Sequence, residues 1–193
     1  MAASIITKKA MASSLKELMT TTPFEKISIA QICTSCGMNR KSFYYHFKDK
    51  YDLLNWIFDT DFSKFKWDNA VSFSYNDRKE FLVDIYNQFF EDRGFYRKAL
   101  RIEGQNSFYD HLRERIYPLL KERITFAFNN ENVDEFYINF FTDALFGTIV
   151  RWLTDKDPIA PSQLLSKLDR LFQDTASAVY NTSTQKETNN KTS

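Results

Sequence analysis

Apolar residues recur three or four positions apart along most of the chain, which is the spacing of one side of an α-helix. This pattern predicts an all-α protein. Outside the segment described next, the predicted helices span residues 4–20, 77–92, 95–103, 108–128, 133–154 and 161–180. The polar stretch 67–76 is predicted to be a loop, and the polar residues 181–193 are predicted to be disordered.

The segment after the first helix contains three closely spaced helix starts. Ser28, with Gln31 three residues later, forms the pattern of a capping box, so a short helix is predicted to begin there. Gly37 is predicted to end it, because glycine readily takes the left-handed conformation that follows many helices. Asn39 then caps a third short helix, and Asp49 opens a fourth.

The third helix, predicted over residues 40–47, has an apolar and a polar side. At 100° per residue, Phe43 and Phe47 fall together and are predicted to face the core, whereas Lys41 and Tyr45 point away from them. The N-terminal end adds free backbone N–H groups that favour phosphate. Two short helices joined by a glycine turn, the second with such an exposed side, are typical of a helix-turn-helix that binds the major groove.

The distribution of charge supports this interpretation. The whole chain is nearly neutral, with 26 Lys and Arg against 25 Asp and Glu. Residues 1–50, however, hold eight basic and three acidic side chains, so the remainder is net negative. A basic segment therefore coincides with the predicted helix-turn-helix, and the near-neutral total does not argue against nucleic acid as a partner.

Composition excludes several other classes. Four Gly and four Pro are too few for the turns of an all-β fold, and no glycine-rich phosphate-binding loop is present. The most apolar stretch is interrupted by Asp143 and Arg151, so no membrane-spanning helix and no membrane partner are expected. Two cysteines and the lack of a signal-peptide pattern predict a cytoplasmic protein in a reducing environment.

The segment 28–54 resembles the DNA-binding segment of TetR/AcrR-type transcriptional regulators. That family has an aliphatic-Ala helix, a Gly, and then a run close to Tyr-x-His-Phe-x-x-Lys-x-x-Leu. The residues that match directly are Gly37, Tyr44, His46, Phe47, Lys50 and Leu53. The likeness covers about residues 6–56, roughly a quarter of the chain. Departures are small: Phe43 replaces a usual Leu, Asn39 a usual Ser, and Cys33 and Cys36 stand where Ala is usual.

The resemblance implies a homodimer with two domains in each subunit. A helix-turn-helix DNA-binding domain is expected at residues 1–50, or to about 56 with the start of the connecting helix, and a helical dimerisation and effector domain at 51–180. It also implies that Tyr44 and Lys50 contact phosphates, while the rest of the third helix approaches base edges or the backbone. The expected DNA-binding residues are Ser28, Asn39, Arg40, Lys41, Ser42, Tyr44, Tyr45, His46 and Lys50.

The predicted helix at 133–154 is apolar on two sides, and such a helix usually has neighbours on both. One neighbour could be the same helix of a second subunit, so that this helix and the last one form a symmetric four-helix interface. The interface residues expected on this basis are Phe141, Leu145, Ile149, Trp152, Leu164, Leu168, Leu171 and Phe172. The alternative, that both sides are buried within one subunit, is open at this stage.

Other chemistry is weakly signalled. Cys33 and Cys36 form a single CxxC without a second ligand pair, so packing is expected there and neither a metal nor a cofactor. His111 is expected on an ordinary helix surface, with a role in a ligand pocket as the alternative. The chain has no nucleophile–base pattern, so a helical enzyme is a remote alternative. The intact basic groups of the third helix argue against a partner-binding protein that has lost DNA binding.

The function predicted from the sequence is a DNA-binding transcriptional regulator. A two-fold dimer predicts a palindromic operator with half-sites roughly 34 Å apart, or a multiple of that spacing. An effector on the second domain would change the separation of the two reading helices. Repression is the family's commoner mode. Segment 41–58 is similar to a subfamily related to the dihydroxyacetone kinase operon activator, in which a kinase-like protein partners the second domain, so activation through a co-activator is the alternative.

Overall fold

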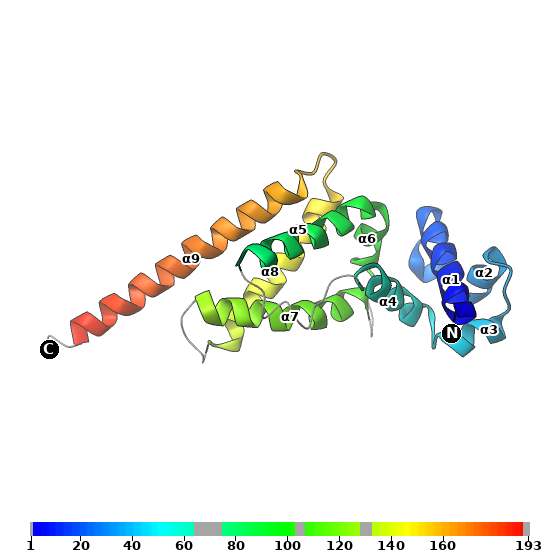
Figure 1. The fold of residues 1–193 in the computed structure, drawn as a ribbon, viewed down its shortest axis with the longest axis horizontal. Helices are drawn as coiled ribbons and strands as arrows, with labels where there is room; N and C mark the ends of the chain where they lie inside the picture. Colours follow the sequence, from blue (N-terminus) through cyan, green and yellow to red (C-terminus); the bar gives the residue numbers. More distant parts are fainter. Residues whose placement is uncertain (1, 64–74, 103–106, 128–132, 191–193) are drawn as a thin grey trace. The chain divides into compact units, whose positions relative to one another are not determined.

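The computed structural model describes most of the chain. The described ranges are residues 2–63, 75–102, 107–127 and 133–190. Within these ranges the backbone forms helices and turns and no strand, so the predicted all-α class is confirmed (Figure 1). The loop predicted at 67–76 lies almost entirely outside them. None of the described helices combines the length and apolar character that crossing a lipid bilayer requires.

The chain divides into two compact units. The first comprises residues up to 66 together with 88–113, and the second comprises 67–87 together with the residues from 114 onward. The helices are α1 (Ala2–Thr21), the 3-10 turn η1 (Phe24–Lys26), α2 (Ile29–Ser35), α3 (Arg40–His46), α4 (Lys50–Asp61), α5 (Tyr75–Glu91), α6 (Arg93–Ala99), α7 (Phe108–Ala127), α8 (Glu135–Thr154) and α9 (Pro161–Asn190). Both α5 and α7 contribute residues to each unit. The first unit thus contains α6 and the start of α7 as well as α1–α4.

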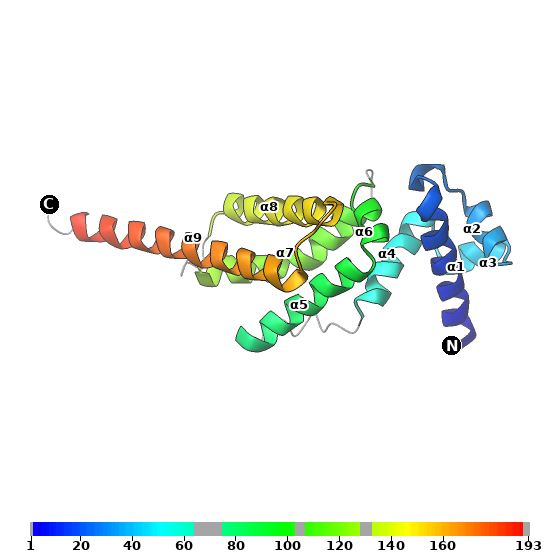
Figure 2. The same cartoon turned by 90° about the horizontal axis from the view of Figure 1, so that it is seen from above.

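Within the first unit, α1 is the helix around which the others gather. It contacts α2, α3, α4 and α6, and Figure 2 shows α1, α2 and α3 side by side. Met11, Leu15 and Met19 lie on its buried side, each at most 1% exposed. Phe43 from α3 is also fully buried. The apolar side of α3 therefore packs against the other helices of the first unit.

The short helices of this unit begin where the sequence predicts. Ser28 Oγ accepts from the backbone N–H of Gln31, and Gln31 Oε1 accepts from the backbone N–H of Ser28 at 2.8 Å, which completes the capping box. Asn39 Oδ1 accepts from the Ser42 N–H at 2.8 Å. Gly37 has a φ of +67°, the left-handed conformation that a side chain would strain. A capping side chain or a left-handed glycine thus stands at each of these boundaries.

In the second unit, α7, α8 and α9 share a core. Leu120 and Ile124 on α7 are buried against Ile138 on α8. Phe141 on α8 and Phe172 on α9 pack against this cluster, with their ring centroids 5.3 Å apart. Apolar side chains from three helices thus hold the unit together.

Several boundaries differ from the sequence-based expectation, among them both ends of α6 and the end of α9. The break before α6 falls at Asp92, and Gly94 lies inside the first turn of α6. Helix α6 ends at Ala99, and the N–H groups of Arg101 and Ile102 then bond to carbonyls three residues back, which tightens the chain into a turn. Helix α9 continues to Asn190, past the predicted start of the disordered tail, in a stretch without Gly or Pro to stop it.

Candidate nucleic-acid interface

Helix α3 separates an apolar side from an exposed side, as predicted. Phe43 and Phe47 are 0% and 3% exposed, and their ring centroids lie 5.7 Å apart. Tyr45, on the opposite side, is 82% exposed, and Lys41 is exposed beside it. Burial of the two phenylalanines therefore fixes which side chains α3 presents outward.

The exposed side of α3 carries cationic and hydrogen-bonding groups. Arg40 and Lys41 are exposed in its first turn, and about half of Tyr44 is accessible. Ser42 and His46 are half-buried on the flanks. Six of the predicted DNA-binding residues thus share one short helix, which matches the chemistry needed to contact phosphates and base edges.

The side chains of two predicted DNA-binding residues are hydrogen-bonded as helix caps. The side-chain oxygens of Ser28 and Asn39 are engaged in capping α2 and α3. Each cap satisfies a backbone N–H that the first turn of a helix leaves unpaired. These side chains therefore stabilise the first turns of α2 and α3.

The resemblance implies a phosphate contact for Lys50, and in the structure its side chain is bonded to the segment that precedes α2. Its ammonium donates to the backbone carbonyls of Phe24, Glu25 and Ile27 at 2.7, 3.0 and 3.0 Å. It also lies 4.6 Å from the centre of the Phe24 ring. Burial lowers the pKa of Lys50, which the charge of Glu25 partly offsets. The side chain is bonded inside the unit.

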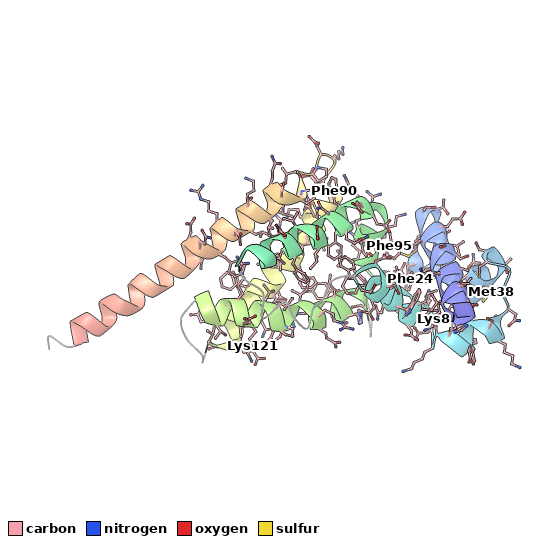
Figure 3. The ribbon with its side chains drawn as sticks, viewed as in Figure 1. Lys8, Phe24, Met38, Phe90, Phe95 and Lys121 are labelled. Carbon is pink, nitrogen blue, oxygen red and sulfur yellow. The ribbon has the colours of Figure 1, made fainter. Side chains whose placement is uncertain are left out.

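Lys8 is a supporting residue that sequence reasoning missed. Lys8 lies on α1, where Figure 3 labels it. Its ammonium lies 5.2 Å from the centre of the Phe47 ring at the end of α3 and 5.6 Å from that of Trp56 on α4. Such cation–π contacts are worth about 0.5–1 kcal/mol at accessible sites. Both aromatic partners lie far along the chain from Lys8, so no local pattern indicates the contact.

A second lysine of α1 joins that helix to two other elements of the first unit. Lys16 Nζ lies 2.8 Å from Asp61 Oδ2 and 2.6 Å from Asp92 Oδ2. Tyr96 of α6 donates its hydroxyl to the same Asp61 oxygen at 2.6 Å. Burial disfavours the charged form of Lys16, but the hydrogen bonds and charges of the two carboxylates outweigh this effect and raise its pKa. We refer to Lys16, Asp61, Asp92 and Tyr96 as the Lys16 cluster.

The C-terminal end of α1 is also bonded to α6. Lys98 Nζ donates to the backbone carbonyls of Met19 at 2.5 Å and Thr20 at 2.7 Å. Carbonyls in the last turn of a helix lack partners within the helix, and a cation there also interacts favourably with the helix dipole. Helix α6 therefore caps the helix that supports α3.

Two family models match this arrangement. The model described as "Bacterial regulatory proteins, tetR family" matches residues 13–57. The model described as "Transcriptional regulator C-terminal region" matches residues 76–174, about half of the chain. The chain belongs to the TetR family. It is a TetR-family transcriptional regulator, as its sequence predicts.

A curated relative of this TetR-family chain is the HTH-type dhaKLM operon transcriptional activator DhaS of Lactococcus lactis subsp. lactis (strain IL1403). The two are 31% identical over 100 residues, which is 52% of each chain. The match thus spans about half the length of that relative.

Solved structures show the same fold over nearly the whole chain. Dihydroxyacetone kinase operon activator DhaS has a TM-score of 0.65 at 22% identity and covers 90% of this chain and 98% of its own. A TetR transcriptional regulator from Streptococcus agalactiae 2603V has a TM-score of 0.66 at 18% identity, with coverages of 91% and 96%. NalD, the secondary repressor of the MexAB-OprM multidrug efflux pump in Pseudomonas aeruginosa, has a TM-score of 0.60 at 16% identity and covers 89% of this chain and 96% of its own.

In this regulator, the residues expected at the dimer interface fall into two groups. Ile149, Trp152 and Leu164 are at most 6% exposed within the subunit, so their side chains are already covered. Trp152 lies edge-on to Tyr86, 5.9 Å between ring centroids, and donates to the carbonyl of Ile159. The partly covered or exposed members are Phe141, Leu145, Leu168, Leu171 and Phe172.

The exposed apolar surface of α8 lies on a different side from the predicted residues. Phe136 is 69%, Tyr137 47% and Phe140 57% exposed, and Leu171 on α9 is 57% exposed. The sequence pattern showed two apolar sides of α8 but could not say which one the subunit covers. Large exposed aromatic groups of this kind are uncommon on a monomer surface when they are contiguous.

The remaining candidates have ordinary surroundings. Cys33 and Cys36 are free thiols; Cys33 is buried, which raises its pKa, and Cys36 Sγ donates to the Ile32 carbonyl. His111 Nε2 lies 3.0 Å from Asp59 Oδ1 and is partly buried in the first unit. Among the described residues, no group of three His, Cys, Asp or Glu side chains is arranged to hold a metal ion.

Proposed function

We propose that this TetR-family regulator binds a palindromic operator as a homodimer, with α3 of each subunit in a major groove. The exposed side of α3 is the observation that supports it most directly. Arg40 and Lys41 are exposed in the first turn, and Lys41 lies opposite the buried Phe43. Two-fold symmetry then sets the half-site spacing at roughly 34 Å or a multiple of it.

The proposed dimer interface uses the exposed side of α8 together with Leu171 of α9. Phe136, Phe140, Ala144 and Gly147 follow one another at spacings of three and four, and all are exposed. A Cβ added at Gly147 would meet no atom within 4 Å, so the subunit itself does not require glycine there. Small residues beside exposed aromatics allow a second copy of α8 to approach closely.

Two modes of regulation are candidates. Repression, with an effector bound by the second unit, follows the family's commoner mode. Activation through a protein co-activator is the second candidate, and it is favoured by the similarity to DhaS, which is named an operon activator. In either mode the protein acts on DNA, and we place it in the cytoplasm.

The test begins with DNA selection by the full-length protein from a random-sequence duplex pool. The expected result is enrichment of a palindromic sequence, with both of its half-sites protected by the bound protein in a footprinting assay. Failure to enrich any sequence contradicts the proposal. Transcription in vitro from a promoter carrying the selected site then decides between repression and activation.

Sedimentation tests the interface. Gly147→Leu adds bulk into open space of the subunit and is expected to shift the protein toward monomer without unfolding it. Gly94→Leu is the matched control, because Gly94 also lies in a helix with open space around its Cβ position. A dimer unaffected by Gly147→Leu contradicts the proposed surface.

A further inference from the structure

Lys50 occupies a position that the preferences of its own helix do not explain. It is the first residue of α4, where the helix dipole is positive and a cation is unfavourable. Asp49 and Asp52 supply the negative groups expected at such an end. A lysine here is better explained by what its ammonium contacts elsewhere.

The ammonium has as many acceptors as it has protons. Its three N–H groups are matched by the carbonyls of Phe24, Glu25 and Ile27, all within 3.0 Å. The Lys50 ammonium lies over the Phe24 ring, and the same ring makes an edge-on contact with Tyr51 in the first turn of α4. A phosphate contact would require at least one of these bonds to be released.

The three carbonyls belong to the connector between α1 and α2. Phe24 and Glu25 lie in η1, and Ile27 directly precedes Ser28, the residue that caps α2. These carbonyls stand where one helix has ended and the next has not begun. Lys50 therefore bonds the first turn of α4 to the start of α2, in the unit that also holds α3.

We propose that Lys50 is a positioning residue for DNA binding: it holds the α1–α2 connector and thereby the N-terminal end of α2, and it does not contact phosphate. The inference rests on the proposed DNA-binding function. It replaces the role that the family resemblance implies for this residue. The side chain acts through Ser28 and Gln31, whose capping box lies at the end that it holds.

Arginine separates the two roles. A phosphate contact is kept or strengthened by Arg, which binds phosphate with two parallel hydrogen bonds. We call the three hydrogen bonds from Lys50 to the connector the brace. Arg does not preserve the brace, because a planar guanidinium cannot direct three donors at the converging carbonyls of Phe24, Glu25 and Ile27. Lys50→Arg is therefore expected to behave like Lys50→Met.

The experiment measures binding of the full-length protein to a duplex selected from a random pool, over a range of salt concentrations at a temperature where every variant is folded. Lys50→Met and Lys50→Arg are each expected to raise Kd about tenfold or more at all salt concentrations, the size of losing a charge-assisted hydrogen bond. For both variants, the slope of the logarithm of the association constant against the logarithm of the salt concentration is expected to match that of the wild-type protein. Lys48→Met, which removes an exposed charge two positions earlier, is the matched control.

Several results would overturn the proposal. One is a salt slope that is shallower by about 0.9 in Lys50→Met, the change expected when the protein neutralises one phosphate fewer. Others are full rescue of binding by Lys50→Arg, an unchanged Kd in Lys50→Met, or the same parallel rise in Kd for Lys48→Met. An unchanged Kd with a lowered thermal midpoint would assign Lys50 to stability alone.

The result distinguishes this inference from the proposed function. If the wild-type protein enriches no DNA sequence, the DNA-binding proposal fails. Protease susceptibility of the connector at residues 23–27 then tests the brace by itself. Cleavage there is expected to be faster in Lys50→Met than in Lys48→Met, and equal rates would reject the brace.

Discussion

Two pairs of phenylalanines, each four residues apart, have opposite environments in this protein. Phe43 and Phe47 on α3 are 0% and 3% exposed, whereas Phe136 and Phe140 on α8 are 69% and 57% exposed. Spacing tells which residues share a side of a helix, but whether that side is covered depends on its neighbours. On α3 a cationic side marks the exposed direction; α8 is apolar on both sides and offers no such contrast.

The strongest test of this comparison replaces one member of each pair. Phe43→Ala is expected to cost about 3–5 kcal/mol of unfolding free energy, because it leaves a cavity in a packed core. Phe140→Ala is expected to change the stability of the subunit by no more than about 0.5 kcal/mol. It should instead weaken the proposed dimer.

Denaturant unfolding at several protein concentrations separates these effects, since only the loss of a dimer depends on concentration. The Phe43→Ala loss should persist at every concentration. If both variants lose the same unfolding free energy at every protein concentration, the exposed side of α8 is covered within its own subunit. The two phenylalanine pairs would then not differ in environment.

The next largest effect is expected in the Lys16 cluster. Lys16→Met leaves the partly buried carboxylates of Asp61 and Asp92 without their shared cation. Removing one partner of a buried pair costs several kcal/mol, and the partial exposure here reduces the expectation to roughly 2–3 kcal/mol. Lys9→Met, on the exposed side of the same helix, is the control and should be close to neutral.

The same cluster predicts a dependence on pH. The pKa of Lys16 is raised above its ordinary value of 10.5 in the folded protein. Its contribution is therefore complete below pH 10.5 and is lost as the pH rises through the folded-state pKa. Lys16→Met should lack this part of the alkaline loss. Parallel stability curves for wild type and Lys16→Met above pH 10 would contradict the assignment.

On the exposed side of α3, the expected effects are on recognition and leave the fold intact. Arg40→Ala is expected to relax base preference by about 1–3 kcal/mol if the guanidinium makes a bidentate base contact. Its thermal midpoint should equal that of wild type, since the side chain is exposed. Selection from a randomised site measures the preference. An unchanged preference would place Arg40 on the backbone of the DNA.

The part of the first unit from α2 to the start of α4 was predictable from sequence because its signals are local. Ser28, Asn39 and Gly37 each determine a helix boundary at their own position, and the structure shows all three acting there. The helix-turn-helix pattern and the TetR resemblance lie in the same segment. What local signals did not reveal were the contacts of Lys8 and Lys50, whose partners lie on other elements.

The second unit was predictable only in part. The positions of α7 and α8 followed from periodicity, but the assignment of Trp152 and Ile149 to a dimer interface did not anticipate that the subunit itself covers them. Trp152 is covered through Tyr86 and the Ile159 carbonyl. Neither contact follows from residues three or four positions away. The exposed side of α8 therefore could not be chosen from the sequence.

The smallest predicted effect tests whether local signals determine the start of α3. Asn39→Ala removes the side-chain oxygen that accepts from the Ser42 N–H and is expected to cost about 1 kcal/mol. Asn39→Ser keeps a capping oxygen and should restore most of that loss. Chemical denaturation measures both. If Asn39→Ser is as unstable as Asn39→Ala, the packing of Phe43 and Phe47 holds α3 without its cap, and the first unit depends on its neighbours as much as α8 does.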